Sequence, residues 1–165
     1  MIQKYSHVTL YVLDQDVAYD FYVNKLGFEV RMDHNMGSWR WLTVSPPAQP
    51  DLQIVLLPVM TGPTVDEAAA AQIRELVKGG KLMTGVMQTA DCQKTYEELR
   101  AKGVEFTSPP HEKFYGIEAI MKDPFGNWFS LTQPKEMSQA KAGCGLWAIS
   151  EAPSVSSEWL CFVSG

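Results

Sequence analysis

The stretch M-K-D-P-F-G-N-W-F-S-L-T-Q, residues 121–133, decides the fold. It predicts the end of one strand, a tight turn and a second strand. Pro124 fixes the φ angle at the first turn position, and Gly126 supplies a conformation with positive φ. After the turn, Trp128 and Ser130 fall on one face of the predicted strand and the residues between them on the other, which is typical of a half-buried strand.

The order of elements around this turn occurs twice in the chain. Residues 1–58 predict a strand, a helix and three further strands, and residues 81–134 predict the same series. The two helix caps, Asp14 and Asp91, lie 77 positions apart. Between the repeats, residues 59–80 predict a connecting helix, with Thr64 and Glu67 as its capping box. The duplication favours an α+β fold of two tandem βαβββ modules, in which paired curved mixed sheets enclose a shared cup.

Two prolines interrupt the second module. Val104 to Thr107 predicts its second strand, and the sequence Ser108-Pro109-Pro110 predicts the end of that strand. The segment K-F-Y-G at 113–116 then predicts an exposed aromatic loop suited to covering the opening of the cup.

Composition and charge exclude several classes of function. With a net charge of −5 and no run of lysine or arginine, the chain lacks the basic surface that nucleic-acid binding requires. No apolar run approaches the roughly 20 residues of a membrane-spanning helix. The first residues lack the apolar stretch of a signal peptide, and the three cysteines form no C-x-x-C pair. We therefore expect a cytoplasmic protein that binds neither nucleic acid nor membrane.

Three segments resemble the vicinal oxygen chelate superfamily, which includes glyoxalase I, bleomycin- and fosfomycin-resistance proteins and extradiol dioxygenases. Residues 7–30 are similar to the opening strand, helix and L-G-F turn of that family. Residues 90–106 are similar to the same unit in its second module, and D-P-F-G-N at 123–127 is similar to its late turn. The resemblance implies the paired-module fold, a small-molecule ligand and a homodimer.

The resemblance also implies four candidate site positions, on the first and last strand of each module. Carried over residue by residue, these positions are His7, Gln53, Thr84 and Ser130. Metal-binding members have a glutamate where this chain has Ser130. An imidazole, an amide and two neutral hydroxyls supply no charge to balance a divalent cation. We therefore expect no metal and no other cofactor, and a divalent metal is the alternative, with Glu118 as a further ligand if it points into the cup.

Aromatic residues near the predicted cup favour a flat or hydrophobic ligand. Trp41, Phe114 and Tyr115 are the aromatic candidates for ligand contact, and packing in the core is an alternative role for such residues. His7 and Glu118 are the candidates for catalysis, because a histidine can exchange protons near neutral pH.

The sequence leaves two functions open. The first is a metal-independent binding protein that sequesters an aromatic or hydrophobic molecule, similar to the resistance proteins. The second is a metalloenzyme, either a glyoxalase-like lyase or isomerase or a dioxygenase similar to the extradiol enzymes. The last segment, 135–165, has no clean periodicity, and we treat it as a C-terminal extension of unknown role.

Overall fold

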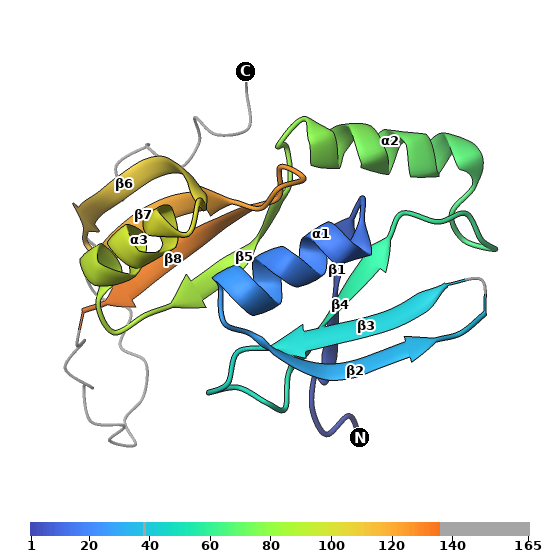
Figure 1. Cartoon of the computed structure of the whole chain (residues 1–165), viewed down its shortest axis with the longest axis horizontal. Helices are drawn as coiled ribbons and strands as arrows, with labels where there is room; N and C mark the ends of the chain where they lie inside the picture. Colours follow the sequence, from blue (N-terminus) through green and yellow to red (C-terminus); the bar gives the residue numbers. More distant parts are fainter. Residues whose placement is uncertain (38, 136–165) are drawn as a thin grey trace, which may run out of the picture.

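The computed structural model of the chain describes residues 1–37 and 39–135. In this part the elements alternate as the duplication predicts, with one additional helix between the two modules (Figure 1). Their bounds are β1 His7–Val12, α1 Gln15–Tyr19, η1 Asp20–Lys25, β2 Glu29–Asn35, β3 Arg40–Ser45, β4 Gln53–Pro58, α2 Glu67–Lys78, β5 Met83–Gln88, α3 Cys92–Ala101, β6 Glu105–Lys113, β7 Gly116–Lys122 and β8 Trp128–Pro134. The predicted C-terminal extension at 135–165 lies outside the described residues except for Lys135.

Each module forms one four-stranded mixed sheet. The strand order is β1-β4-β3-β2 in the first sheet and β5-β8-β7-β6 in the second, so both sheets have the same topology. In each sheet the first strand runs parallel to the last one, and the remaining neighbours are antiparallel. The strands β1 and β5 are therefore edge strands of their own sheets. The predicted α+β fold of two mixed sheets is confirmed.

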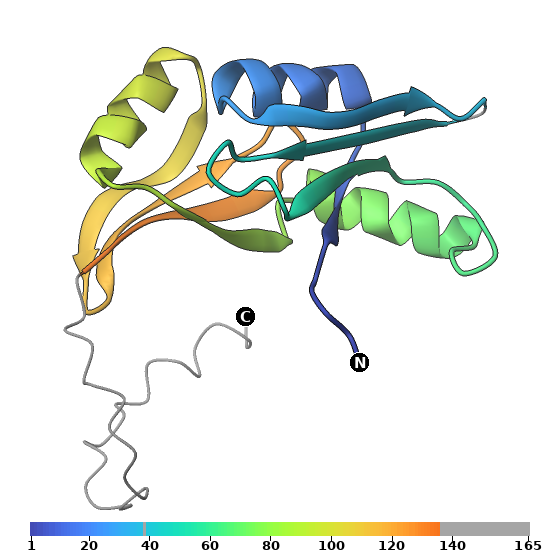
Figure 2. The ribbon, with the colours of Figure 1, turned by 90° about the horizontal axis from the view of Figure 1, so that it is seen from below.

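The helices of the two modules lie on the same side of the two sheets (Figure 2). Asp14 begins the first one, because its carboxylate accepts hydrogen bonds from the backbone N–H groups of Asp16 and Val17. That helix changes from α1 to the π-helical turn η1 after Tyr19. Asp91 begins α3 in the same way, by accepting from the N–H group of Lys94. Both caps were predicted from the sequence and are confirmed.

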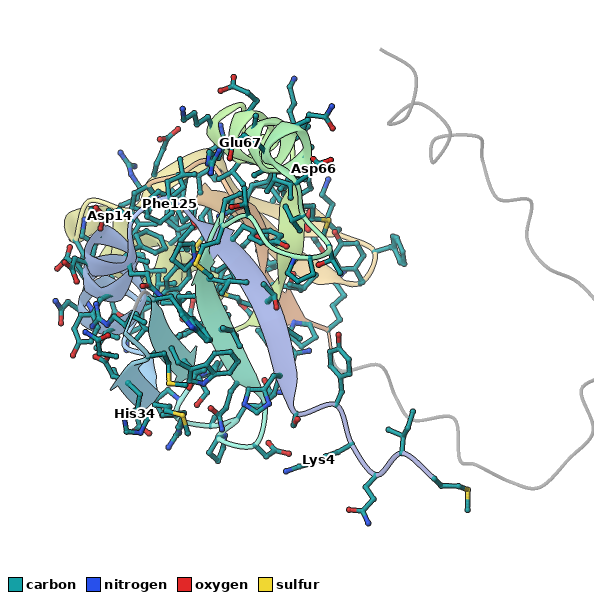
Figure 3. All side chains as sticks on the ribbon, turned by 90° about the vertical axis from the view of Figure 1, so that its right-hand side faces the viewer. Lys4, Asp14, His34, Asp66, Glu67 and Phe125 are labelled. Atoms are coloured by element: carbon teal, nitrogen blue, oxygen red, sulfur yellow. The ribbon has the colours of Figure 1, made fainter. Side chains whose placement is uncertain are left out.

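The connecting helix α2 begins two residues later than its predicted cap. Its N-cap is Asp66, whose carboxylate accepts a hydrogen bond from the N–H group of Ala69. Asp66 and Glu67 lie together at the start of this helix (Figure 3). The predicted capping box at Thr64 was therefore wrong, because the carboxylate of Asp66 caps the helix from a position two residues later. Within the described residues, none of the helices has the length and apolarity needed to cross a bilayer.

The strand β6 extends through the two prolines that were expected to end it. It continues to Lys113, and its pairing with β7 shifts between Ser108 and His111. The prolines are tolerated because β6 is the outermost strand of its sheet, where a missing N–H group need not face a neighbouring strand. The predicted break at Ser108-Pro109-Pro110 is thus a local irregularity of an edge strand.

The hydrophobic core joins the two modules. One cluster of buried side chains includes Leu10 and Phe21 from the first module, Met121 and Phe129 from the second, and Val77 from α2. In β1 the core residue Leu10 alternates with residues on the other face of the sheet. We call the face of each sheet that is turned away from α1 and α3 its distal face.

A buried polar network strengthens this junction at the turn 123–127. The Asp123 carboxylate accepts hydrogen bonds from the hydroxyl of Tyr22 at 2.8 Å, from the backbone N–H groups of Phe125 and Asn127, and from the side-chain amide of Asn127. The same amide donates to the carbonyl of Tyr11 at 2.9 Å. Asp123 and Asn127 are almost fully buried. The turn that identifies the repeat therefore also holds the second module against the first.

Candidate functional site

The predicted site residues of the first module form one group on its distal face. His7 on β1 is the direct partner of Gln53 on β4. The hydroxyl of Thr43 on β3 donates to the side-chain oxygen of Gln53 at 2.7 Å. The ring of His7 lies 6.2 Å from that of Trp41, and Trp39 packs edge-on against Trp41 at 5.5 Å. This group combines an exposed imidazole, an amide and an aromatic wall.

The predicted residues of the second module form a second group, on the distal face of their own sheet. The hydroxyl of Ser130 on β8 donates to the carboxylate of Glu118 on β7 at 2.5 Å. It also lies 2.8 Å from the hydroxyl of Thr132. Because Ser130 has one hydroxyl proton and gives it to Glu118, Thr132 is the donor of the second bond. The result is a chain of hydroxyls that ends on a carboxylate.

Tyr115 extends this group at the tip of the β6–β7 hairpin. Burial raises the pKa of Tyr115, and its hydroxyl hydrogen bond to Glu118 and the negative charge of Glu118 raise it further. Phe114 beside it is 82% exposed and packs edge-on against the Tyr115 ring at 4.9 Å. The predicted aromatic loop is therefore a hairpin tip, in which Tyr115 turns toward the polar group and Phe114 faces solvent.

Thr84 does not lie where the repeat predicts it. In β5 the register passes from Met83 opposite Trp128 to Gly85 opposite Phe129, so Thr84 is the extra residue of a β-bulge. Its hydroxyl donates to the carbonyl of Trp128 at 2.9 Å. The residue opposite Ser130 is Val86. The extra residue in β5 moved Val86 to the position that the repeat had predicted for Thr84. The regular offset between the two repeats did not reveal this extra residue.

The two groups are separate within one chain. Hydrogen bonds and aromatic contacts join residues within each sheet, and among the described residues none of these contacts links His7 or Gln53 to Glu118 or Ser130. The buried hydroxyls of Thr43 and Thr132, which the sequence analysis did not select, belong to the two groups. The alternation of strands β3 and β8 was the pattern that could have identified them.

The donor atoms of these groups do not fit a divalent metal. The Gln53 oxygen already accepts from Thr43, the Thr84 hydroxyl is bonded to a backbone carbonyl, and the Ser130 hydroxyl donates to Glu118. In the part of the chain that the structure describes, no three His, Cys, Asp or Glu side chains are placed to hold an ion together. Tight sites for transition metals use imidazole, thiolate and carboxylate ligands. We therefore derive no chemical step through a metal.

Comparison with known families settles the relationship of the chain. Residues 4–131 match the model of the Glyoxalase/Bleomycin resistance protein/Dioxygenase superfamily. The chain belongs to this superfamily. The match includes both modules and the D-P-F-G-N turn, so the resemblance inferred from these segments is confirmed.

Several individual proteins are similar to this chain over nearly their whole length. The uncharacterized protein YurT of Bacillus subtilis (strain 168) is 34% identical over 126 residues, which are 76% of this chain and 94% of YurT. The crystal structure of UcmS2 is 45% identical, with a TM-score of 0.75, and the match includes 81% of this chain and 99% of UcmS2. TnmS3, an antibiotic binding protein from Streptomyces sp. CB03234, is 28% identical, with a TM-score of 0.64, over 81% of this chain and 98% of TnmS3.

Glu118→Gln should lower the pKa of Tyr115 toward the ordinary tyrosine value of about 10. The neutral amide removes the negative charge that disfavours the tyrosinate, whereas the contribution of burial remains. Ultraviolet absorbance of tyrosinate during a pH titration measures this change, with Tyr115→Phe identifying the contribution of Tyr115. Glu75→Gln on α2 is the control. An unchanged titration in Glu118→Gln would show that the two side chains do not interact.

Proposed function

We propose that the chain is a metal-independent small-molecule-binding protein that sequesters an aromatic or hydrophobic ligand. The two groups on the distal faces supply the contacts in this proposal. His7, Gln53 and Trp41 contribute from the first sheet, and Ser130, Tyr115, Phe114 and Thr84 from the second. The observation that carries the proposal is the hydrogen bond from Ser130 to Glu118. At the position of Ser130, metal-binding relatives have a carboxylate that binds the metal, whereas this chain has a hydroxyl that is already bonded to Glu118.

The chemistry of the two groups supports binding rather than metal catalysis. Indole and phenol rings present broad apolar surfaces, and the hydroxyls and amide nearby can orient a ligand through hydrogen bonds. The similarity to TnmS3, which is described as an antibiotic binding protein, is consistent with such a role. Within one chain, His7 and Glu118, the two candidates for catalysis, lie on different sheets.

The separation of the two groups leads us to include a second copy of the chain in the proposal. A homodimer can place the His7 group of one copy against the Ser130 group of the other, so that one ligand contacts both. Static light scattering on the samples used for binding tests this arrangement. A mass of two chains supports it, and a monomer that binds ligand with full affinity contradicts it.

A thermal-shift screen in the presence of EDTA tests the binding function. The panel consists of planar aromatic compounds together with bleomycin, which is included because the superfamily is named in part after bleomycin resistance proteins. We expect at least one compound to raise the Tm, because a ligand that binds only the folded state stabilises it by an amount that grows with the logarithm of its concentration above Kd. Trp41→Ala should reduce that shift.

Metal analysis of the purified protein tests the alternative function, a metalloenzyme. Near-stoichiometric zinc, nickel, manganese or iron, together with the absence of any Tm shift in EDTA, would favour the metalloenzyme over the binding protein.

A further inference from the structure

The seam between the two sheets contains a cavity of about 770 Å³. Its walls include Leu10 and Ile54 from the first sheet, Met87 and Phe129 from the second, and Leu26 and Leu99 from the helical segments. All six belong to the hydrophobic core or pack against it. The cavity therefore follows the seam where the two modules meet. These six residues come from the side of the sheets that carries α1 and α3, whereas Val86, the partner of Ser130, comes from the distal side.

This seam cavity differs from the distal-face groups described above. Of the residues assigned to those groups, only Thr84 borders it, and His7, Gln53, Glu118 and Ser130 do not. Its sides are formed by β1 and β5, which are the edge strands of the two sheets. Backbone groups on the outward edge of both strands therefore face the seam. The carbonyl of Tyr11 on β1 is already bonded there to the side-chain amide of Asn127.

The walls of the seam cavity contain no ionisable side chain among the residues that the structure describes. Their polar groups are hydroxyls and amides, such as those of Thr9 and Gln88, and the hydroxyls of Thr89 and Thr95 are 2.7 Å apart and bonded to each other. A charged ligand would lose its hydration here without gaining an opposite charge, which is costly. The chemistry of the walls therefore selects an uncharged, largely apolar molecule.

We propose that the seam cavity is a second ligand site and that it binds an uncharged, largely apolar small molecule. Ligand sites of drug-sized molecules have volumes of about 300–1,000 Å³ and mostly apolar walls with a few polar groups, and the seam cavity has both properties. The proposal goes beyond the distal-face function, because only Thr84 of the residues assigned to that function borders the seam cavity.

Gly85 offers a direct way to fill the seam cavity. It borders the cavity, and a Cβ atom added there would meet nothing within 4 Å. Its φ angle does not lie in the left-handed region, so a larger side chain is compatible with the backbone. Gly62 shares both properties but lies before α2 and does not border the cavity. Gly85→Phe and Gly62→Phe are therefore a matched pair of variants.

Two fluorescent probes that share one ring skeleton test the proposal on the full chain. N-phenyl-1-naphthylamine is uncharged, and 1-anilinonaphthalene-8-sulfonate adds a single negative charge to that skeleton. We expect saturable binding of the uncharged probe and at least tenfold weaker binding of the anionic one. Gly85→Phe should weaken binding of the uncharged probe at least tenfold, whereas Gly62→Phe should leave it unchanged.

A charge-introducing variant gives a second test that does not depend on filling the cavity. Gln88 is exposed and borders the cavity at the end of β5, so Gln88→Lys adds a positive charge there. We expect it to tighten binding of the anionic probe about fivefold, which corresponds to one favourable charge pair near the surface.

Three results would overturn the proposal. The first is equal affinity of the uncharged probe for Gly85→Phe and Gly62→Phe. The second is tighter binding of the anionic probe than of the uncharged one by the unmodified chain. The third is the absence of saturable binding of the uncharged probe by the unmodified chain. The comparison of Gly85→Phe with Gly62→Phe changes no residue assigned to the distal faces, so this proposal and the distal-face function can fail separately.

Discussion

Gly126→Ala should lower the free energy of unfolding by about 3 kcal/mol, a large effect for a single added methyl group. Gly126 has a φ angle of +105°, which side chains with a Cβ atom rarely adopt. A Cβ atom there would also lie 2.4 Å from the carbonyl oxygen of Val77 at the end of α2. Because this neighbour is backbone, the clash can be relieved only by moving the turn away from the helix.

Thermal unfolding followed by circular dichroism measures the effect of Gly126→Ala. For a chain of this length, about 3 kcal/mol corresponds to a decrease in Tm of roughly 10 °C. Gly62→Ala is the control, since an added Cβ atom at Gly62 meets nothing within 4 Å, and its Tm should remain close to that of the unmodified chain. Equal Tm values for the two variants would contradict the close approach of the turn to α2.

Tyr22→Phe should lower the free energy of unfolding by about 2 kcal/mol at neutral pH, as expected for a lost hydrogen bond to a charged group. The Tyr22 hydroxyl donates to the buried carboxylate of Asp123 at 2.8 Å, and burial raises the pKa of Tyr22 well above its ordinary value. Without the hydroxyl, the carboxylate keeps its three bonds within the turn and loses the bond to the first module. Urea unfolding measures the loss, with Tyr5→Phe at a 77% exposed site as the control.

The same carboxylate should make stability depend on pH. Burial raises the pKa of Asp123 above its ordinary value, although its hydrogen bonds lower it. Between the unfolded and folded pKa values, the folded chain holds a proton that the unfolded chain has released. The contribution of Asp123 to the free energy of unfolding is therefore fully present below the unfolded pKa and is lost as the pH rises through the folded pKa.

Two variants isolate this contribution from those of other carboxyl groups. Asp123→Asn should remove the pH-dependent contribution of Asp123. The difference in unfolding free energy between this variant and the unmodified chain should therefore change between the unfolded and folded pKa values of Asp123. Tyr22→Phe should move the change to higher pH, because the hydrogen bond that it removes lowers the pKa of Asp123. Urea unfolding from about pH 3 to pH 8 covers the range. A difference that does not vary with pH would contradict the buried, ionisable role of Asp123.

Much of the fold could be predicted because its determinants are local. The caps at Asp14 and Asp91 act on N–H groups within three residues, and the strand faces follow from simple alternation. The cap of α2 was misplaced at Thr64, since Asp66 is an equally strong capping residue next to it. The prolines of β6 were misinterpreted because a sequence does not reveal that a strand lies at the edge of its sheet.

The candidate site was less predictable because it depends on register and on contacts between distant segments. The bulge at Thr84 changes which residue lies opposite Ser130. The alternation of apolar and polar residues in the sequence does not show where such an extra residue is inserted. The bond between Tyr22 and Asp123 spans 101 positions, so neither residue could be assigned its partner from local patterns. The seam cavity likewise exists only once the two modules are packed together.

Calorimetric titration with the compound that gives the largest thermal shift tests the central claim most directly. The titration uses protein treated with EDTA, and a parallel sample receives zinc or manganese in place of the chelator. Metal-independent binding predicts the same affinity and the same stoichiometry in both samples. Binding that disappears with EDTA and returns with added metal would contradict the account and would assign the distal faces to a metal centre.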